Sequence, residues 1–433
     1  MNKLLNKRQI IILSVMSIIT ATLALCMWAA GVFSASVPAS GNEAQAWETS
    51  RDPRPSLNEN ILWETRIGGT GKESLLAAFS LDDRIVIFGN TESSDCDFAQ
   101  GSGLRGFIAT LSDKGVTESF CETAEITAVS LHDDGFLLGL ANPVRLRLID
   151  FDLAAVNETP LYGDENERVR DILLTDDGYT VITAVNDGET GADSLKIIKY
   201  DRSLKKISSR VLARSARIQY IDSFAFPDRT VVAVNFDFGA VQCMSLIVAA
   251  TGSPLYYDIT TEGGYRACDV IPYENGFAAL ILSDGNADIL TVNEKYEAAK
   301  KIYLNSAECS SGKLFVSDEN IYAYVHKQDD MSKLYTLDGA LNYIGSVPQA
   351  NTLTAAHAQY DRGEYTNLLC SSADKTVILS LGPTAQTLEL KVETLKCLWL
   401  KTRDGLVIVA EALYGEDCGN QIGDADIALI RLT

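Results

Sequence analysis

The chain has 433 residues, 46% of them hydrophobic and 22% charged, which excludes the disordered and fibrous classes. Its net charge of −21 disfavours nucleic acid and anionic membrane surfaces as partners. Only three histidines occur, His132, His326 and His357, and so few do not favour a metal or proton-transfer site. His132 lies beside an acidic turn and is expected at the surface.

The N-terminus has the pattern of a membrane-targeting segment. Residues 1–9 form a basic tail with Lys3, Lys7 and Arg8, expected in the cytoplasm. Residues 10–33 are uncharged and apolar, and as a helix they would span about 36 Å, against about 30 Å for the hydrocarbon core. A cleavable signal is usually shorter, so the run predicts one transmembrane anchor, with secretion after cleavage as the alternative. The expected location is the bacterial cell membrane, with the remainder of the chain extracytoplasmic.

Residues 34–60 are rich in Ser, Ala, Pro and charged residues and lack an apolar period, which predicts a flexible linker. The basic tail contributes +3, so the rest of the chain carries −21 − 3 = −24. The part expected outside the membrane is therefore strongly acidic.

The next stretch, "RIGGTGKES" (residues 66–74), looks like a phosphate-binding loop. That loop requires Gly, four residues, then Gly-Lys-Ser/Thr, and it joins a strand to a helix. Arg66 stands where the first glycine should be, Glu73 stands where the hydroxyl should be, and an apolar run and a hairpin turn follow. The stretch therefore predicts a connection from a strand at Ile61–Ile67 into the next unit, not a nucleotide site.

From residue 61 onward, an acidic turn between two apolar runs recurs eight times. Asp, Asn and Gly at such turns are typical of β-hairpins. The intervals between the third residues of successive turns run from 42 (405 − 363) to 51 (135 − 84) residues. A period of this size in all-β sequence matches one four-stranded propeller blade. The third residues of the turns are Arg84, Gly135, Gly178, Arg229, Gly276, Asn320, Gly363 and Gly405.

The units have room for four strands each. In the third unit we expect strands at 169–175, 179–185, 194–201 and 205–212, and in the fifth at 267–273, 276–282, 287–293 and 298–304. The eighth unit stops after its third strand, "DIALIRLT", and Ile61–Ile67 could supply the missing one and hide an open edge. The prediction is an all-β fold: a single eight-bladed β-propeller over residues 61–433, with seven blades as the alternative.

A resemblance supports this fold. Residues 62–115, with "LWETRIGGTGKES", "LDDRIVIFGNTESS" and "GFIATLSDKG", resemble the repeat of bacterial secreted or membrane-anchored β-propellers. "AATGSPLYY" (Ala249–Tyr257) resembles, more weakly, a step of outer-membrane-assembly and quinoprotein-like propellers. The resemblance implies the fold and an extracytoplasmic setting, and it carries no catalytic residue across.

Eight cysteines lie outside the apolar N-terminal run, an even number that suggests disulfides in an exported chain. Placed on the blade map, all eight fall on one face, with buried thiols as the alternative. The predicted disulfides are Cys96–Cys121, Cys243–Cys268, Cys309–Cys370 and Cys397–Cys418.

Two long acidic loops, Thr91–Gly103 and Tyr414–Asp426, belong to blades that would be neighbours in a closed ring. Loops of this length on a rigid scaffold often bind a ligand. Solvated acidic loops, a partner-binding surface and a calcium site remain open. The carboxylates of this predicted binding rim are Asp95, Asp97, Glu416, Asp417 and Asp424.

No residue is assigned a catalytic, cofactor or metal role, and no cofactor is expected apart from the calcium alternative. The predicted function is a non-enzymatic, membrane-anchored extracytoplasmic module with a monomeric ectodomain. It would bind a protein, peptide or glycan partner and contact the membrane only through the N-terminal helix. One alternative is a polysaccharide hydrolase or lyase with carboxylates at the centre of the ring; another is an envelope-assembly scaffold.

Overall fold

The computed structural model describes residues 61–432 apart from short gaps, and residues 1–60, with the expected anchor and linker, lie outside the described residues. Within the described part, no helix is long and apolar enough to cross a membrane. The gaps are 82–83, 99–102, 162–165, 186–191, 239–241, 251–252, 261–264, 284, 307–308, 318–319, 328–332, 339–341, 349–354, 362–363, 372–375, 381–386, 391–392, 403–404 and 414–425.

The first half of the chain forms three antiparallel sheets of consecutive strands. The third sheet has seven strands because the long β13 pairs with β12 and then with β14. The bounds are β2 (Glu73–Leu81), β3 (Arg84–Thr91), β4 (Arg105–Ser112) and β5 (Thr117–Ala124); β6 (Ile126–His132), β7 (Gly135–Leu140), β8 (Arg145–Asp150) and β9 (Ala155–Pro160); and β10 (Glu167–Thr175), β11 (Gly178–Val185), β12 (Ala192–Asp201), β13 (Lys206–Ala225), β14 (Thr230–Asp237), β15 (Gln242–Ala249) and β16 (Leu255–Asp258).

The second half forms four sheets of four strands. The last of them takes one strand from the start of the described chain, in the order β1-β31-β30-β29. The bounds are β17 (Tyr265–Tyr273), β18 (Gly276–Ser283), β19 (Asn286–Val292) and β20 (Ala298–Ser306); β21 (Cys309–Ser317), β22 (Asn320–Lys327), β23 (Lys333–Leu337) and β24 (Tyr343–Pro348); β25 (Ala355–Asp361), β26 (Glu364–Ser371), β27 (Thr376–Ser380) and β28 (Thr387–Leu390); and β29 (Glu393–Thr402), β30 (Gly405–Leu413), β31 (Asp426–Leu432) and β1 (Ile61–Ile67).

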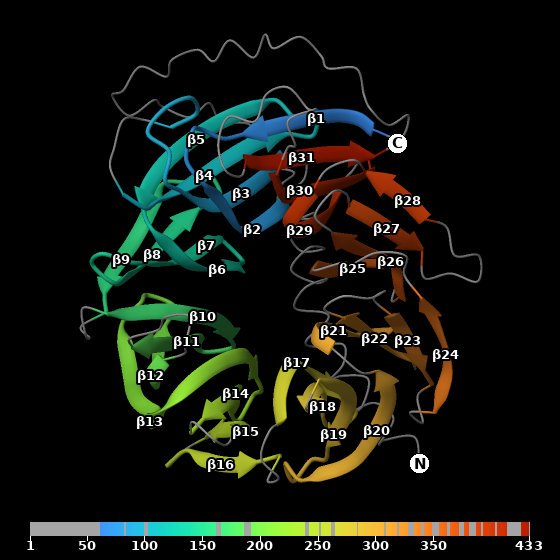
Figure 1. Ribbon diagram of the computed structural model, residues 1–433. Coiled ribbons are helices and arrows are strands. Elements are labelled where there is room, and N and C mark those ends of the chain that lie inside the picture. The colour runs from blue at the N-terminus through green and yellow to red at the C-terminus, as the bar shows by residue number, and fades with distance from the viewer. Residues whose placement is uncertain are drawn as a thin grey trace, which may run out of the picture.

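The sheets stand side by side around a ring (Figure 1). Strands such as β2, β6, β10, β17 and β21 lie nearest the ring axis, and β5, β9, β20 and β24 lie at the outside. β1 pairs antiparallel with β31, from Ile61 opposite Leu432 to Ile67 opposite Ile427. Because β1 covers the edge of β31, the two ends of the described chain meet in one sheet. We call the junction between this sheet and the β2–β5 sheet the seam.

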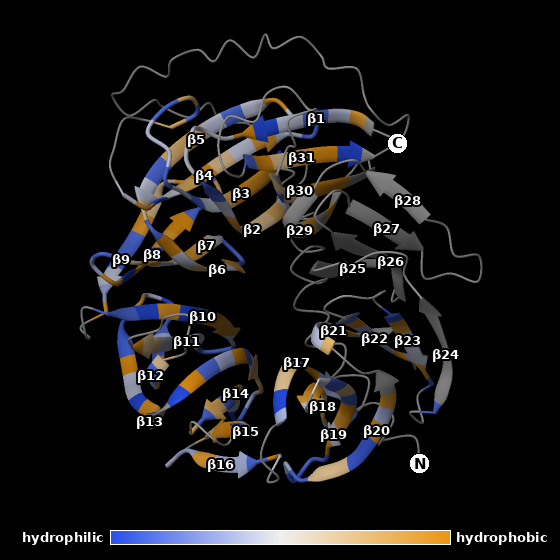
Figure 2. Ribbon diagram, viewed as in Figure 1, coloured by the Kyte–Doolittle hydropathy of each residue, from blue (hydrophilic) through white to orange (hydrophobic). Residues whose placement is uncertain are grey.

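The middle strands form the core because each sheet packs between two neighbours. Every residue of β7 and of β11 is buried, whereas all but one residue of the outer strand β9 is exposed. Figure 2 shows the apolar residues concentrated in the middle strands. Strands buried on both faces read as continuous apolar runs, which explains the pattern on either side of the acidic turns.

Seven of the strands next to the ring axis share one irregularity, a β-bulge near the start of the strand or, in β13, of its part that pairs with β14; in β25 the register shift lies near the end, between Gln359 and Tyr360. A bulge adds one residue and turns the side chains around it. It therefore decides which residues face the next sheet. The register shifts fall between Leu75 and Ala77, Ile126 and Ala128, Val169 and Asp171, Tyr220 and Asp222, Ala267 and Asp269, Cys309 and Ser311, and Thr394 and Lys396.

The strand predictions for the third and fifth units are confirmed to within a few residues, apart from the continuation of β13 into the next unit. The surface prediction for His132 is wrong. This side chain is buried and its ring packs edge-on against Tyr179 of the neighbouring sheet, with 6.0 Å between centroids. Burial lowers the pKa of His132.

Candidate functional site

The glycine-rich stretch lies at the seam, and its backbone donors are bonded to side chains of the chain itself. Gly68 N–H donates to Asp97 Oδ2 (2.7 Å), Gly69 N–H to Glu73 Oε2 (3.2 Å), Thr70 N–H to Asp95 Oδ1 (2.8 Å) and Gly71 N–H to Ser93 Oγ (2.8 Å). A phosphate-binding loop needs such N–H groups for its ligand. Here they are already used, and the stretch acts as a structural connection.

Glu73 is the most enclosed of these acids, with 0% of its surface exposed. Its Oε1 accepts hydrogen bonds from Thr91 Oγ1 (2.7 Å) and Ser93 Oγ (2.6 Å). Burial is the main reason that the pKa of Glu73 rises to about 7, and the nearby carboxylate of Asp426 adds to the rise. The seam therefore holds a carboxyl group that changes its charge near neutral pH.

Two further acids of the last sheet line the seam. Glu411 Oε1 accepts the N–H of Leu75 at 2.5 Å, which ties β30 to β2. Asp426 is fully buried and lies directly against Gly68, where an added Cβ would stand 2.0 Å from Asp426 Oδ1. Gly68 thus makes room for a carboxylate, and the seam encloses three acidic side chains.

The predicted rim is only partly visible. Asp95 and Asp97 are partly buried and bond the glycine-rich stretch. Glu416, Asp417 and Asp424 lie outside the described residues. Among the residues that the structure describes, no group of three or more His, Cys, Asp or Glu side chains is arranged to hold a metal ion.

Two of the predicted disulfides, Cys96–Cys121 and Cys243–Cys268, are not formed in this structure. Cys121 carries a thiol and packs toward the β6–β9 sheet, whereas Phe98, next to exposed Cys96, packs toward the last sheet. Cys121 and Phe98, two residues after Cys96, thus pack toward different neighbouring sheets. Cys243 and Cys268 also carry thiols, in two different apolar clusters. The face of the ring on which a cysteine lies does not fix the neighbouring sheet that its side chain contacts, because successive side chains of a strand point to opposite sides of the sheet.

For the other two predicted disulfides, the side chains of Cys370, Cys397 and Cys418 lie outside the described residues. Cys309 is described, is buried, and shares its cluster with Cys268. His357 also falls outside the described side chains, and His326 is buried in β22.

A second polar site, missed by sequence reasoning, lies along the ring axis. Three consecutive strands next to the axis, β10, β13 and β17, carry aspartate directly after the bulge: Asp171, Asp222 and Asp269. We call these three residues the aspartate arc. Only the registers show that they are equivalent, because the sequence does not reveal the bulges.

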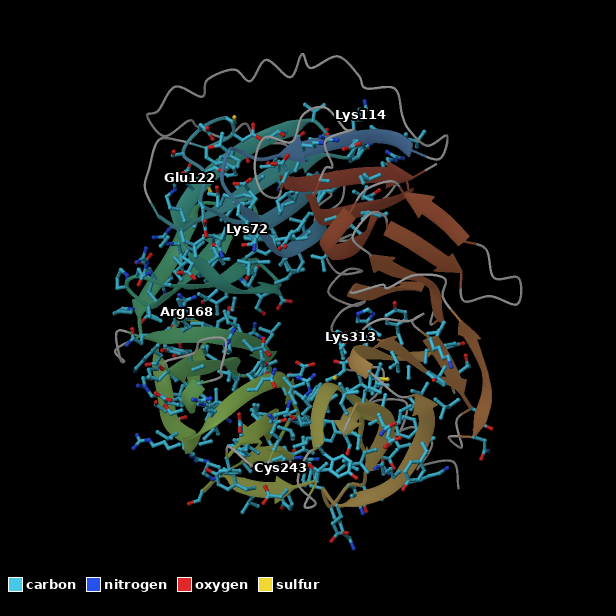
Figure 3. All side chains as sticks on the ribbon, in the orientation of Figure 1. Lys72, Lys114, Glu122, Arg168, Cys243 and Lys313 are labelled. Atoms are coloured by element: carbon cyan, nitrogen blue, oxygen red, sulfur yellow. The ribbon has the colours of Figure 1, made fainter. Side chains whose placement is uncertain are left out.

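Groups of the next inner strand hold two members of the arc in place. Asp171 Oδ2 accepts hydrogen bonds from Tyr220 Oη (2.9 Å) and Ser223 Oγ (2.5 Å). Asp269 pairs with Lys313 Nζ at 3.2 Å and accepts the N–H of Leu314 at 2.8 Å. Lys313 lies at the inner edge of the ring in Figure 3.

Asp222 is the central member and has the fewest ties. Its described hydrogen bond is from the N–H of Ser223, at 2.7 Å to Oδ1. Burial is the main reason that its pKa rises to about 7; the charges of Asp171 and Asp269 also raise it, and Lys313 lowers it. Asp222 therefore keeps acceptor capacity for a ligand and can hold a proton near neutral pH.

A pocket of about 290 Å³ lies elsewhere, between the outer ends of β9, β12 and β13. Its lining includes Lys196, Lys206 and Arg210, with Glu167 paired to Lys196 at 2.8 Å. Arg210 donates to the carbonyl of Ala250 (3.0 Å). The pocket carries more positive than negative side chains, in contrast to the aspartate arc.

No protein-family model and no curated protein matches the sequence. Among solved structures, the chain is similar to the Dos1 propeller, with 12% identity and a TM-score of 0.54 over 85% of this chain and 94% of that one. It is also similar to the propeller domain of the Trilobed protease from Pyrococcus furiosus, with 12% identity and a TM-score of 0.44 over 74% and 99%. A functionally unknown protein from Desulfotomaculum acetoxidans gives 13% identity and a TM-score of 0.41 over 65% and 90%. The likeness to the Dos1 propeller concerns the fold alone, and by that fold the chain is an all-β protein of β-propeller type.

Proposed function

We propose that the chain is a membrane-anchored extracytoplasmic β-propeller that binds a basic segment of a partner protein at the aspartate arc. The observation that carries the proposal is the repetition of aspartate at one position in three consecutive strands beside the ring axis. Carboxylates repeated at one register position of neighbouring inner strands suit a cationic ligand. The net charge of −24 outside the basic tail favours the approach of such a partner.

We further propose that the ring has eight blades. In this interpretation the long strand β13 serves two blades. Its first part pairs with β12 and is the outer strand of the blade that begins at β10. Its second part, Arg217–Ala225, pairs with β14 and is the inner strand of the next blade. The other six sheets supply one blade each. A density map of the purified ectodomain that resolves eight radial sheets would support this count, and seven would overturn it.

The location rests on the N-terminal residues. A basic tail followed by an apolar run supports a single-pass protein with its propeller outside the cytoplasm. Protease added to intact cells should digest the propeller and spare a tag placed before residue 1. Digestion only after cell lysis would contradict this orientation.

The binding proposal is tested with the full chain in detergent micelles and a fluorescent Lys/Arg-rich peptide. At pH 8.5, above the pKa of about 7, Asp222 is ionised, and Asp222→Asn should weaken the peptide affinity about tenfold, since one charge contact of about 1.4 kcal/mol is lost. Asp228→Asn is the matched control, because Asp228 lies in an exposed turn with 72% of its side chain accessible. Equal binding of a neutral peptide, or of neutral glycans, would contradict the proposal.

A polysaccharide hydrolase or lyase is the second candidate. The observation that favours it is a carboxyl group with a pKa of about 7, Asp222, beside a second one, Asp171. Such a pair can act as general acid and base. If a panel of polysaccharides gives a product and Asp222→Asn abolishes it while Asp228→Asn does not, this candidate replaces the binding module.

A further inference from the structure

Two cysteines from neighbouring blades meet beside the aspartate arc. Cys268 is the extra residue in the bulge of β17, between Ala267 and Asp269. Cys309 is the first residue of β21 and stands just before the bulge of that strand. β17 and β21 are neighbouring inner strands that contact each other (Figure 1). Both sulfur-bearing side chains pack in the same apolar cluster between the two blades.

The same two positions meet at other junctions of the ring. Leu76, in the bulge of β2, packs in one cluster with Ile126, before the bulge of β6. Ile221, in the bulge of β13, packs in one cluster with Ala267, before the bulge of β17. The propeller therefore places the two positions in one apolar cluster between sheets repeatedly. At the β17–β21 junction both are cysteine.

The surroundings of the pair permit chemistry between them. Cys268 is partly exposed, whereas Cys309 is 7% exposed. The N–H of Gly312 in β21 bonds the Cys268 sulfur, and the charge of Cys309 acts on the same thiol. Burial is the main reason that the pKa of Cys268 rises to about 11. Because the thiolate is the attacking form, this raised pKa makes Cys268 react slowly near neutral pH.

We propose that Cys268 and Cys309 form a disulfide that joins β17 to β21 when the protein meets a disulfide-bearing oxidant, such as a small-molecule disulfide or an oxidised thiol–disulfide oxidoreductase. The Cys268 thiolate attacks one sulfur of the oxidant and releases one thiol. Cys309 then attacks the Cys268 sulfur of the mixed disulfide and releases the second thiol. The two cysteine protons end on the two released thiols, and the oxidant takes up two electrons.

The bond would join β17, which carries Asp269, to β21, which carries Lys313. It would therefore restrict the separation of the two strands that form this ion pair. This inference does not depend on what the arc binds, because the experiment detects the disulfide itself and not a bound ligand. The two thiols enclose a long stretch of chain, and closing such a loop stabilises the folded state.

The experiment incubates the full chain in detergent micelles with oxidised glutathione, alkylates the remaining thiols and maps the peptides without reduction. We expect one linked peptide that contains Cys268 and Cys309, and a melting temperature about 5 °C higher that returns to its starting value with dithiothreitol. Cys121→Ser is the matched control and should give the same linked peptide and the same shift.

Cys268→Ser and Cys309→Ser should each abolish the linked peptide and the reversible shift. If a variant fails to fold, the peptide map of the unaltered protein still decides. Glutathione retained on Cys268, full alkylation of both thiols after the incubation, or linkage of either cysteine to a different one would overturn the proposal.

Discussion

Two junctions of the propeller bury a glutamate at the same position and treat its charge differently. Glu73 in β2 and Glu167 in β10 occupy equivalent positions, because each lies three residues before the extra residue of the bulge in its strand. Each accepts a hydrogen bond from a threonine of the next strand, Thr91 or Thr183. Glu167 also pairs with Lys196 at 2.8 Å, whereas the charge that acts on Glu73 is that of Asp426.

The difference between the two glutamates arises in the third strand of each sheet, β12 and β4. Thr183 stands opposite Lys196 of β12, while the corresponding Gly89 stands opposite Phe107 of β4. Phe107 is fully buried and brings no charge. A buried carboxyl group with a cation remains ionised, and one without a cation gains by holding a proton. The same position is therefore a fixed ion pair at one junction and a proton-dependent contact at the seam.

Deleting Ile61–Ile67 should have the largest effect, because it removes the strand that covers β31 at the seam. We expect a melting temperature at least about 10 °C lower and aggregation through the exposed edge. Differential scanning calorimetry checks this, with deletion of residues 47–53 as the control of equal length. An unchanged melting temperature would mean that β1 does not close the ring.

Lys196→Met should break the fixed ion pair and leave Glu167 buried with no partner of opposite charge. The expected loss is about 3 kcal/mol in the free energy of unfolding, measured by urea denaturation. Adding Glu167→Gln to this variant should recover most of the loss, because no buried charge then remains. If Lys196→Met alone is neutral, the ion pair does not decide the stability of this junction.

Glu73 should make the seam sensitive to pH. Its pKa in the folded chain, about 7, lies above the ordinary value of 4.5, so the fold prefers the protonated form. Its contribution is fully present below about pH 4.5 and is lost as pH rises through about 7, a change of about 3 kcal/mol. Urea denaturation between pH 4.5 and 8 measures this change.

Glu73→Gln is the variant that isolates this contribution, because the amide resembles the protonated carboxyl group. The variant should match the unaltered protein near pH 5 and exceed its stability at pH 8. Asp228→Asn, in an exposed turn, should leave the pH dependence as it is. Parallel pH curves for Glu73→Gln and the unaltered protein would show that the group does not hold a proton.

The smallest effect is expected from Asp95→Asn at the outer part of the seam. The amide oxygen can still accept the N–H of Thr70, and the site is close to solvent. We expect a loss below about 1 kcal/mol, measured by urea denaturation. A loss of several kcal/mol would show that the glycine-rich connection depends on the charge of Asp95 and not only on its hydrogen bond.

The positions of the strands could be predicted from the sequence, but the side-chain contacts between sheets could not. The strands Gly178–Val185 and Gly276–Ser283 were expected almost to the residue, because acidic turns and apolar runs are local signals. Two of the predicted disulfides are not formed in the structure, and Cys121 of one of them faces the next sheet, a direction that the pleat decides. His132 was misjudged because Tyr179 of another sheet covers it.

The sequence by itself determined the all-β character, the repeat and the place of the hairpins, since turn chemistry acts within a few residues. Only the tertiary structure decided which polar groups meet. Glu411 and Leu75 are 336 positions apart, and the aspartate arc and the pair of Cys268 and Cys309 each join different blades. These meetings depend on bulges and on the packing of one sheet against the next, and neither leaves a local mark in the chain.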